Sequence, residues 1–271
     1  MTQKIIFAVL IVIAGSAVFI FGNPHFRVFP TNGNRAFYIG MTVFFLVCAL
    51  LLKRSPTYAE YWRVAYAFFV ASAALLFLST GVFNLQNSAM PPMKDLAMDK
   101  FSQFLHIVPV IVILTLLSGA KLDSIFISLG NLKRGLLFGI ISFAGFAGLF
   151  LLLGMQTSEY FSSIKKAIPL ILLFIFSNAI MEELWFRSIF LNHFEPHIGR
   201  TAAILVTAFI FGASHLNAAY DFPGGKAVFG LIVFVFGLIG AYAMLKDNSI
   251  IGPVLFHAGY DLLVIIPVLS S

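Results

Sequence analysis

The chain has 271 residues, of which 60% are hydrophobic and 10% are charged, and its formal net charge is +6. A soluble domain carries about 25% charged residues, so this chain has too few polar side chains to cover a water-soluble globule. The composition predicts an integral membrane protein whose partner is the lipid bilayer, and it excludes a cytosolic enzyme. Nucleic acid is excluded as a partner because the basic residues stand singly or in pairs beside apolar runs, as they do in membrane-flanking loops.

Nine apolar runs predict membrane-spanning helices, because about 20 mostly apolar residues cross the hydrocarbon core. In chain order they are Ile5–Phe21, Phe37–Leu52, Trp62–Phe83, Phe104–Leu117, Leu136–Met155, Ala167–Phe190, Ala202–Ala219, Ala227–Leu245 and Ile250–Leu269. The fourth run is short, so we predict an all-α polytopic transmembrane bundle of eight or nine spans. No linker or internal repeat indicates a second domain, and we interpret residues 1–271 as one membrane domain.

The longest linker covers about Asn84–Ser102 and is amphipathic. It contains four charged residues, Lys94, Asp95, Asp99 and Lys100. We expect an ordinary solvated loop here, with a helix lying along the membrane interface as the alternative.

Ionisable residues inside the spanning runs are the most informative feature of the sequence. The second half contains Glu182, Glu183, Arg187, His215, His257 and Asp261. Each costs about 2.5–3.5 kcal/mol at the centre of a spanning helix. Six such residues facing lipid would cost more than about 10 kcal/mol, which is comparable with the whole stability of a domain. They are therefore expected to face one another or a water-filled cavity.

The spacing of these residues predicts which of them meet. Glu183 and Arg187 are i,i+4 neighbours that can pair directly, and His257 and Asp261 have the same spacing. Glu182 is turned by about 100° from Glu183 on a helix. It is therefore free to point elsewhere, along the face that it shares with Asn178 and Trp185.

This combination of side chains suits hydrolysis. A buried carboxylate beside an imidazole can deprotonate water. Further hydrogen-bond donors can stabilise the oxyanion of a tetrahedral intermediate.

The residues also resemble a known family. Glu182-Glu183-x-x-x-Arg187, then Phe211-x-x-x-His215, then His257-x-x-x-Asp261 are similar to the three ordered motifs of the CPBP family. That family comprises CAAX prenyl endopeptidases and bacteriocin-processing membrane proteins. The similarity covers roughly Ala167–Ile266, with Phe186-Arg187 expected to open a loop, and it leaves the role of the N-terminal helices in residues 1–166 open. It implies an intramembrane endopeptidase that acts on a peptide or lipidated protein, in a prokaryotic cytoplasmic membrane.

The resemblance also implies a role for each residue. Glu182 would activate water with the help of His215, while Glu183, Arg187 and Phe211 would support the site. His257 and Asp261 would form the oxyanion site. The family often has Asn at this last position, and an ionised Asp cannot donate a hydrogen bond. We therefore expect Asp261 to orient His257, which leaves His257 as the donor.

Other hypotheses stay open. Glu182, His215 and His257 form a two-His, one-carboxylate set that suits zinc, although the His-Glu-x-x-His helix typical of zinc peptidases is missing. We therefore expect no cofactor, with zinc as the alternative. Gly212-Ala213-Ser214 faintly resembles the serine turn of rhomboid peptidases. A transporter also places ionisable groups in the membrane, and a non-catalytic immunity-type protein would keep the site without using it.

Overall fold

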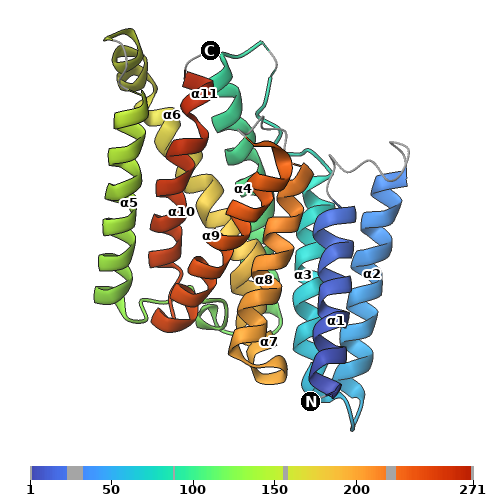
Figure 1. Cartoon of the computed structure of the whole chain (residues 1–271). Coiled ribbons are helices and arrows are strands. Elements are labelled where there is room, and N and C mark those ends of the chain that lie inside the picture. The colour runs from blue at the N-terminus through green and yellow to red at the C-terminus, as the bar shows by residue number, and fades with distance from the viewer. Residues whose placement is uncertain (1, 23–32, 88, 155–157, 218–223, 270–271) are drawn as a thin grey trace.

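The computed structural model describes residues 2–22, 33–87, 89–154, 158–217 and 224–269, and within these residues it contains helices and turns but no strand. The α-helices are α1 (Thr2–Ser16), α2 (Gly33–Arg54), α3 (Trp62–Leu78), α4 (Pro92–Leu117), α5 (Leu132–Gly154), α6 (Ser158–Glu182), α7 (Ile189–Ile198), α8 (Arg200–Ser214), α9 (Gly225–Asp247), α10 (Ile251–Val264) and α11 (Ile266–Leu269). They form one bundle, with the N-terminal and C-terminal ends of the chain at opposite ends of it (Figure 1). The predicted all-α bundle is confirmed.

Seven helical segments of the described chain are long and apolar enough to cross a membrane. Two further apolar helices are shorter: α8 has 15 residues and α10 has 14. At 1.5 Å per residue they extend about 22 and 21 Å, less than the roughly 30 Å of the hydrocarbon core. Helix length therefore supports a polytopic membrane protein, whereas the count of eight or nine spans stays a prediction.

The expected solvated loop at Asn84–Ser102 is wrong over its second half, because α4 already begins at Pro92. Proline is favoured at the first helical position, where its fixed φ suits the helix and its missing N–H is not needed. Met93 and Ala97 are four residues apart and are both buried, so this first part of α4 has an apolar face of its own. The helix is consequently long enough to carry Lys100 into the bundle.

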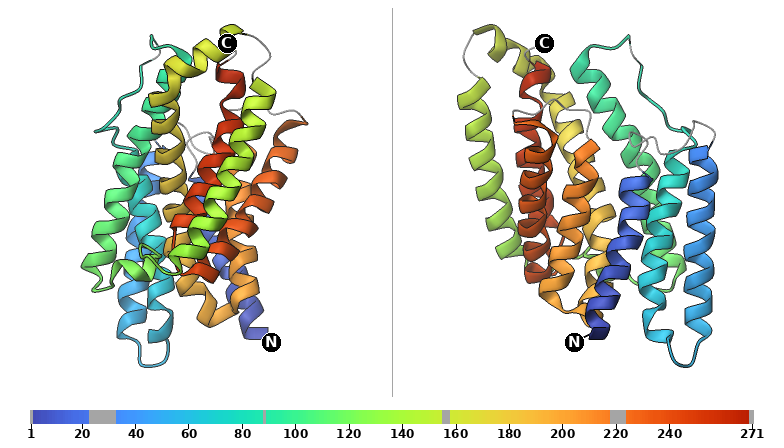
Figure 2. Two further views of the ribbon diagram at one scale, coloured as in Figure 1. Left: turned by 90° about the vertical axis from the view of Figure 1, so that its left-hand side faces the viewer. Right: turned by 45° about the vertical axis from the view of Figure 1, so that its right-hand side comes forward.

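The buried apolar residues form two clusters. The larger core joins α1, α2, α3, α4, α7 and α8, whereas the smaller one is built mainly from α6 and α10. In Figure 1 and in the right-hand view of Figure 2, α2 and α5 lie at opposite edges of the bundle. Leu152 on α5 is 79% exposed, as expected of a helix face turned toward lipid. The candidate site is thus enclosed by the central helices.

Close packing between α8 and α9 fixes one wall of the site. A Cβ atom on Gly212 would lie 2.8 Å from the carbonyl oxygen of Gly230, and one on Gly237 would lie 2.9 Å from Cα of Ala208. Small residues let membrane helices approach backbone to backbone. This contact positions the end of α8, from which His215 extends.

Candidate active site

The first motif lies in a π-helical turn within one long helical run. α6 ends at Glu182, the π-helical turn occupies Glu183–Ser188, and α7 continues from Ile189. The loop expected to open at Phe186-Arg187 is therefore wrong, because the backbone stays helical there. Single π-helical turns inside α-helices occur frequently at functional sites, and here the whole turn is buried.

Glu183 and Arg187 form the predicted i,i+4 ion pair inside this turn. Both side chains are only 1% exposed, so the pair is removed from solvent. The guanidinium group also lies over the ring of Phe211, with Cζ 4.1 Å from the ring centroid. Phe211 therefore supports the first motif from α8 through a cation–π contact.

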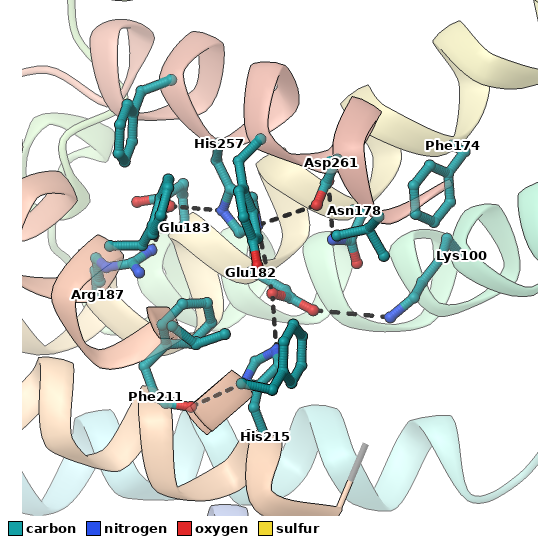
Figure 3. A pocket seen from close by; sticks show the side chains of 16 residues that line it. Lys100, Phe174, Asn178, Glu182, Glu183, Arg187, Phe211, His215, His257 and Asp261 are labelled. Carbon is teal, nitrogen blue, oxygen red and sulfur yellow. Dashed lines mark hydrogen bonds and ion pairs between the residues drawn. The ribbon is translucent and has the colours of Figure 1, made fainter. Parts of the chain in front are cut away.

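The shortest of the ion-pair contacts of His257, on α10, is with Glu183. Its Nδ1 lies 2.8 Å from Oε1 of Glu183, and a carboxylate oxygen accepts the hydrogen bond, so Nδ1 is the donor. Its Nε2 lies 3.6 Å from Oε2 of Glu182 and 3.7 Å from Oδ1 of Asp261. Glu183, rather than Asp261, is thus the hydrogen-bond partner that orients this ring (Figure 3).

Asp261 instead forms a hydrogen bond with a residue of α6. Its Oδ2 accepts a hydrogen bond of 3.0 Å from Nδ2 of Asn178. Asn178 lines the same cavity as Glu182, as expected from the shared helix face. Trp185 points elsewhere and donates its indole N–H to the carbonyl oxygen of Ala71 on α3 at 3.1 Å.

From the end of α8, His215 approaches the same oxygen of Glu182 as His257 does. Its Nδ1 lies 2.8 Å from the carbonyl oxygen of Phe211, which can only accept, so Nδ1 is again the donor. Its Nε2 lies 3.7 Å from Oε2 of Glu182. In their neutral forms both imidazoles therefore carry the Nε2 lone pair, and both present it to the same carboxylate oxygen.

Lys100 is a site residue that the sequence reasoning missed. Its Nζ lies 3.7 Å from Oε1 of Glu182, on the side of the carboxylate away from the two imidazoles (Figure 3). In the sequence it belongs to a stretch expected to be a loop. The signal that could have revealed it is the apolar spacing of Met93 and Ala97, which extends α4 toward its N-terminus.

A cavity of about 40 Å³ separates these groups. Its walls include Lys100, Glu182, His215, His257 and Asp261, together with aromatic side chains. Four buried side-chain atoms on its walls have no hydrogen-bond partner within the described part of the chain: Oδ1 of Asn178, Oε2 of Glu183, Nε of Arg187 and the hydroxyl of Tyr260. Buried polar atoms nearly always have a hydrogen-bond partner. A group of four without one therefore indicates a functional site, where binding or catalysis is favoured at the expense of stability.

A second cavity of about 690 Å³ adjoins the first. The two share Lys100, Glu182 and His215 as lining residues. The lining of the larger cavity combines apolar and polar side chains. The apolar ones include Val18, Phe19, Leu75, Leu78, Trp185, Phe186 and Val268, and the polar ones include Asn84, Gln86, Asp95, Asp99, Ser102, Gln103 and His106. The candidate residues are therefore accessible from an amphipathic space large enough for several side chains.

The structure brings together all the residues that the motifs indicated. Glu182, Glu183, Arg187, Phe211, His215, His257 and Asp261 all line the smaller cavity. Among the described residues no group of three or more His, Cys, Asp and Glu side chains is arranged to hold a metal ion. Ser214 donates its hydroxyl hydrogen to the carbonyl oxygen of Phe211 at 2.8 Å, and its Oγ lies 3.2 Å from Nδ1 of His215.

The second half of the chain is similar to a known protein family. Residues 164–263 match the family model of Rce1-like type II CAAX prenyl endopeptidases, in agreement with the resemblance predicted from the three motifs. No curated protein and no solved structure matches the chain. The family match supports a CAAX-type intramembrane endopeptidase in general, and together with the apolar helices it supports an integral membrane protease with a protein substrate.

Proposed function

We propose that this chain hydrolyses a peptide bond of a membrane-associated or lipidated protein, using a water molecule activated by Glu182 and His215. One observation carries the proposal: Nε2 of His215 and Nε2 of His257 both lie near Oε2 of Glu182, at 3.7 and 3.6 Å. These separations are too long for direct hydrogen bonds. A water molecule beside the three atoms could contact all of them.

In the first chemical step the water oxygen attacks the carbonyl carbon of the substrate. The new C–O bond forms as the carbonyl π bond breaks, and the carboxylate of Glu182 takes one water proton. The Nε2 lone pair of His215 accepts a hydrogen bond from the same water and holds it in line. When the tetrahedral intermediate collapses, the C–N bond breaks and the proton on Glu182 passes to the leaving amine nitrogen.

His257 is suited to stabilise the oxyanion of that intermediate. Its Nδ1 already donates to Glu183, so a second donor at Nε2 requires the imidazolium form. The carboxylates of Glu182 and Asp261, 3.6 and 3.7 Å from Nε2, provide the negative charge that stabilises such a cation. A donor already positioned before the reaction contributes more than one that must reorganise.

The larger cavity is the proposed approach for the substrate. It shares Lys100, Glu182 and His215 with the smaller cavity, and its lining is both apolar and polar. An extended peptide with a large apolar side chain or an attached lipid fits such a lining. Val18 and Phe19, which follow α1, line this cavity together with residues of α3 and α4, and this gives the N-terminal part of the chain a function in substrate binding.

A zinc-dependent mechanism is the second candidate, and one observation favours it. Both imidazoles donate Nδ1–H to an oxygen and aim Nε2 at the carboxylate, as metal-binding histidines commonly do. The sequence lacks the His-Glu-x-x-His helix typical of zinc peptidases, and we therefore prefer the metal-independent mechanism. The two mechanisms differ in their sensitivity to chelators.

The experiment is a cleavage assay on the purified protein in detergent, with prenylated and unprenylated peptide libraries. Wild type is compared with Glu182→Gln, and with Glu60→Gln as a matched control at an exposed glutamate outside the site. We expect cleavage by wild type and by Glu60→Gln, with a loss of at least about 100-fold in Glu182→Gln. Equal turnover by Glu182→Gln would remove the glutamate from the mechanism.

A further inference from the structure

Lys100 contributes charge to the site from outside the segment that matches the family model. It lies on α4, whereas the match covers residues 164–263. Its side chain is 14% exposed and its Nζ lies 3.7 Å from Oε1 of Glu182. The contact joins the N-terminal helices to the carboxylate that is proposed to activate water.

The two oxygens of Glu182 have different surroundings. Oε2 faces Nε2 of His215 and of His257, while Oε1 faces the ammonium group of Lys100. A carboxyl group can rotate about its last side-chain bond, and a cation on one side limits that rotation. Since Glu182 is the last residue of α6, the helix sets the position of its backbone. The rotation of its carboxylate is the conformational freedom that remains.

We propose that Lys100 is a positioning residue that holds Oε1 of Glu182 and thereby keeps Oε2 directed at the two imidazoles and the attacking water. This inference rests on the proposed function of Glu182. Lys100 acts through the glutamate and does not itself exchange a proton with the substrate. Lys100 lines both cavities, so it sets the orientation of Glu182 at the point where the substrate enters the site.

The test is steady-state kinetics with the peptide that wild type cleaves fastest, in Lys100→Met, Lys100→Arg and the control Lys94→Met. Lys94 lies on the same helix and is exposed. Displacing a catalytic group by about 1 Å can lower the rate about 100-fold, so we expect Lys100→Met to lower kcat by about 10–100-fold with KM within about threefold. Lys100→Arg, which keeps the charge, should recover at least a tenth of wild-type kcat.

Three outcomes would overturn the inference. The first is wild-type kcat in Lys100→Met, and the second is a rise in KM alone, which would make Lys100 a substrate-binding group. The third is a folded Lys100→Arg that is as inactive as Lys100→Met. If Lys100→Met does not fold, the comparison of Lys100→Arg with Lys94→Met still decides, because both keep a cation at position 100.

Wild type and Glu182→Gln measured in the same assay separate this inference from the proposed function. Absence of cleavage by wild type, or full cleavage by Glu182→Gln, would refute the function itself. Normal behaviour of those two proteins, with unchanged kcat in Lys100→Met, would refute only the positioning role.

Discussion

Replacing Arg187 with methionine tests the buried ion pair in the π-helical turn. Arg187 is 1% exposed and pairs with Glu183, and its guanidinium lies 4.1 Å from the ring centroid of Phe211. Methionine removes the charge but keeps an unbranched side chain that can fill most of the space. Glu183 would then be a buried carboxylate whose remaining described partner is Nδ1 of His257.

Breaking a buried pair by removing one partner costs about 3–5 kcal/mol. We expect a value near the lower end, about 3 kcal/mol, because the hydrogen bond from His257 still compensates part of the charge on Glu183. At about 1.4 kcal/mol per factor of ten, this is roughly a 100-fold change in the unfolding equilibrium. The double variant Glu183→Gln/Arg187→Met should recover much of the loss, since it leaves no stranded charge.

The assay is unfolding by a denaturing detergent in mixed micelles, followed by tryptophan fluorescence. The chain has two tryptophans, and Trp185 lies buried within the same turn as the pair. Arg200→Met is the matched control, because Arg200 is exposed and such surface changes stay within about 0.5 kcal/mol. Unchanged stability of Arg187→Met with selective loss of turnover would refute this reasoning and make Arg187 a direct catalytic or substrate-binding group.

Three further predictions concern the small cavity. Glu182→Ala, His215→Ala and His257→Ala should each abolish proteolysis without preventing membrane insertion, and normal cleavage at equal protein level would remove that residue from the mechanism. Chelator treatment should leave peptidase activity intact; a loss that zinc restores, with one metal per chain by elemental analysis, would instead support the metallopeptidase. Tyr260→Phe should raise stability by about 1 kcal/mol, because it removes a buried hydroxyl that has no partner within the described residues. A lower melting temperature would contradict that assignment.

The sequence could predict that the charged residues of the second half face one another, because exposing each of them to lipid costs free energy. Residues as far apart as Glu182 and His257 had to meet, since facing lipid costs about 2.5–3.5 kcal/mol each. The Glu183–Arg187 pair followed from helical spacing in the same way. These two predictions require only that the helices are surrounded by lipid and that an α-helix has about 3.6 residues per turn.

The remaining details depended on tertiary structure. The hydrogen bond between His257 and Glu183 joins α10 to the π-helical turn, and no local spacing predicts a contact between two helices. Lys100 was missed because composition alone placed it in a polar linker, whereas buried Met93 and Ala97 keep that stretch helical. The sequence predicted a loop beginning at Phe186-Arg187, where the chain instead forms the π-helical turn, because π-helical turns have no fixed residue pattern.

The π-helical turn at Glu183–Ser188 also has a consequence for how this helix can change over evolution. A π-helical turn accommodates one residue more than an α-helical turn of similar length, so the helices before and after it can keep their packing while the residues inside it are redirected. A single insertion into an ordinary membrane helix is therefore enough to redirect the side chains within the turn, and a single deletion is enough to restore their α-helical directions. The apolar faces of α6 and α7 lie outside the turn, and the scaffold can persist when the chemistry is lost.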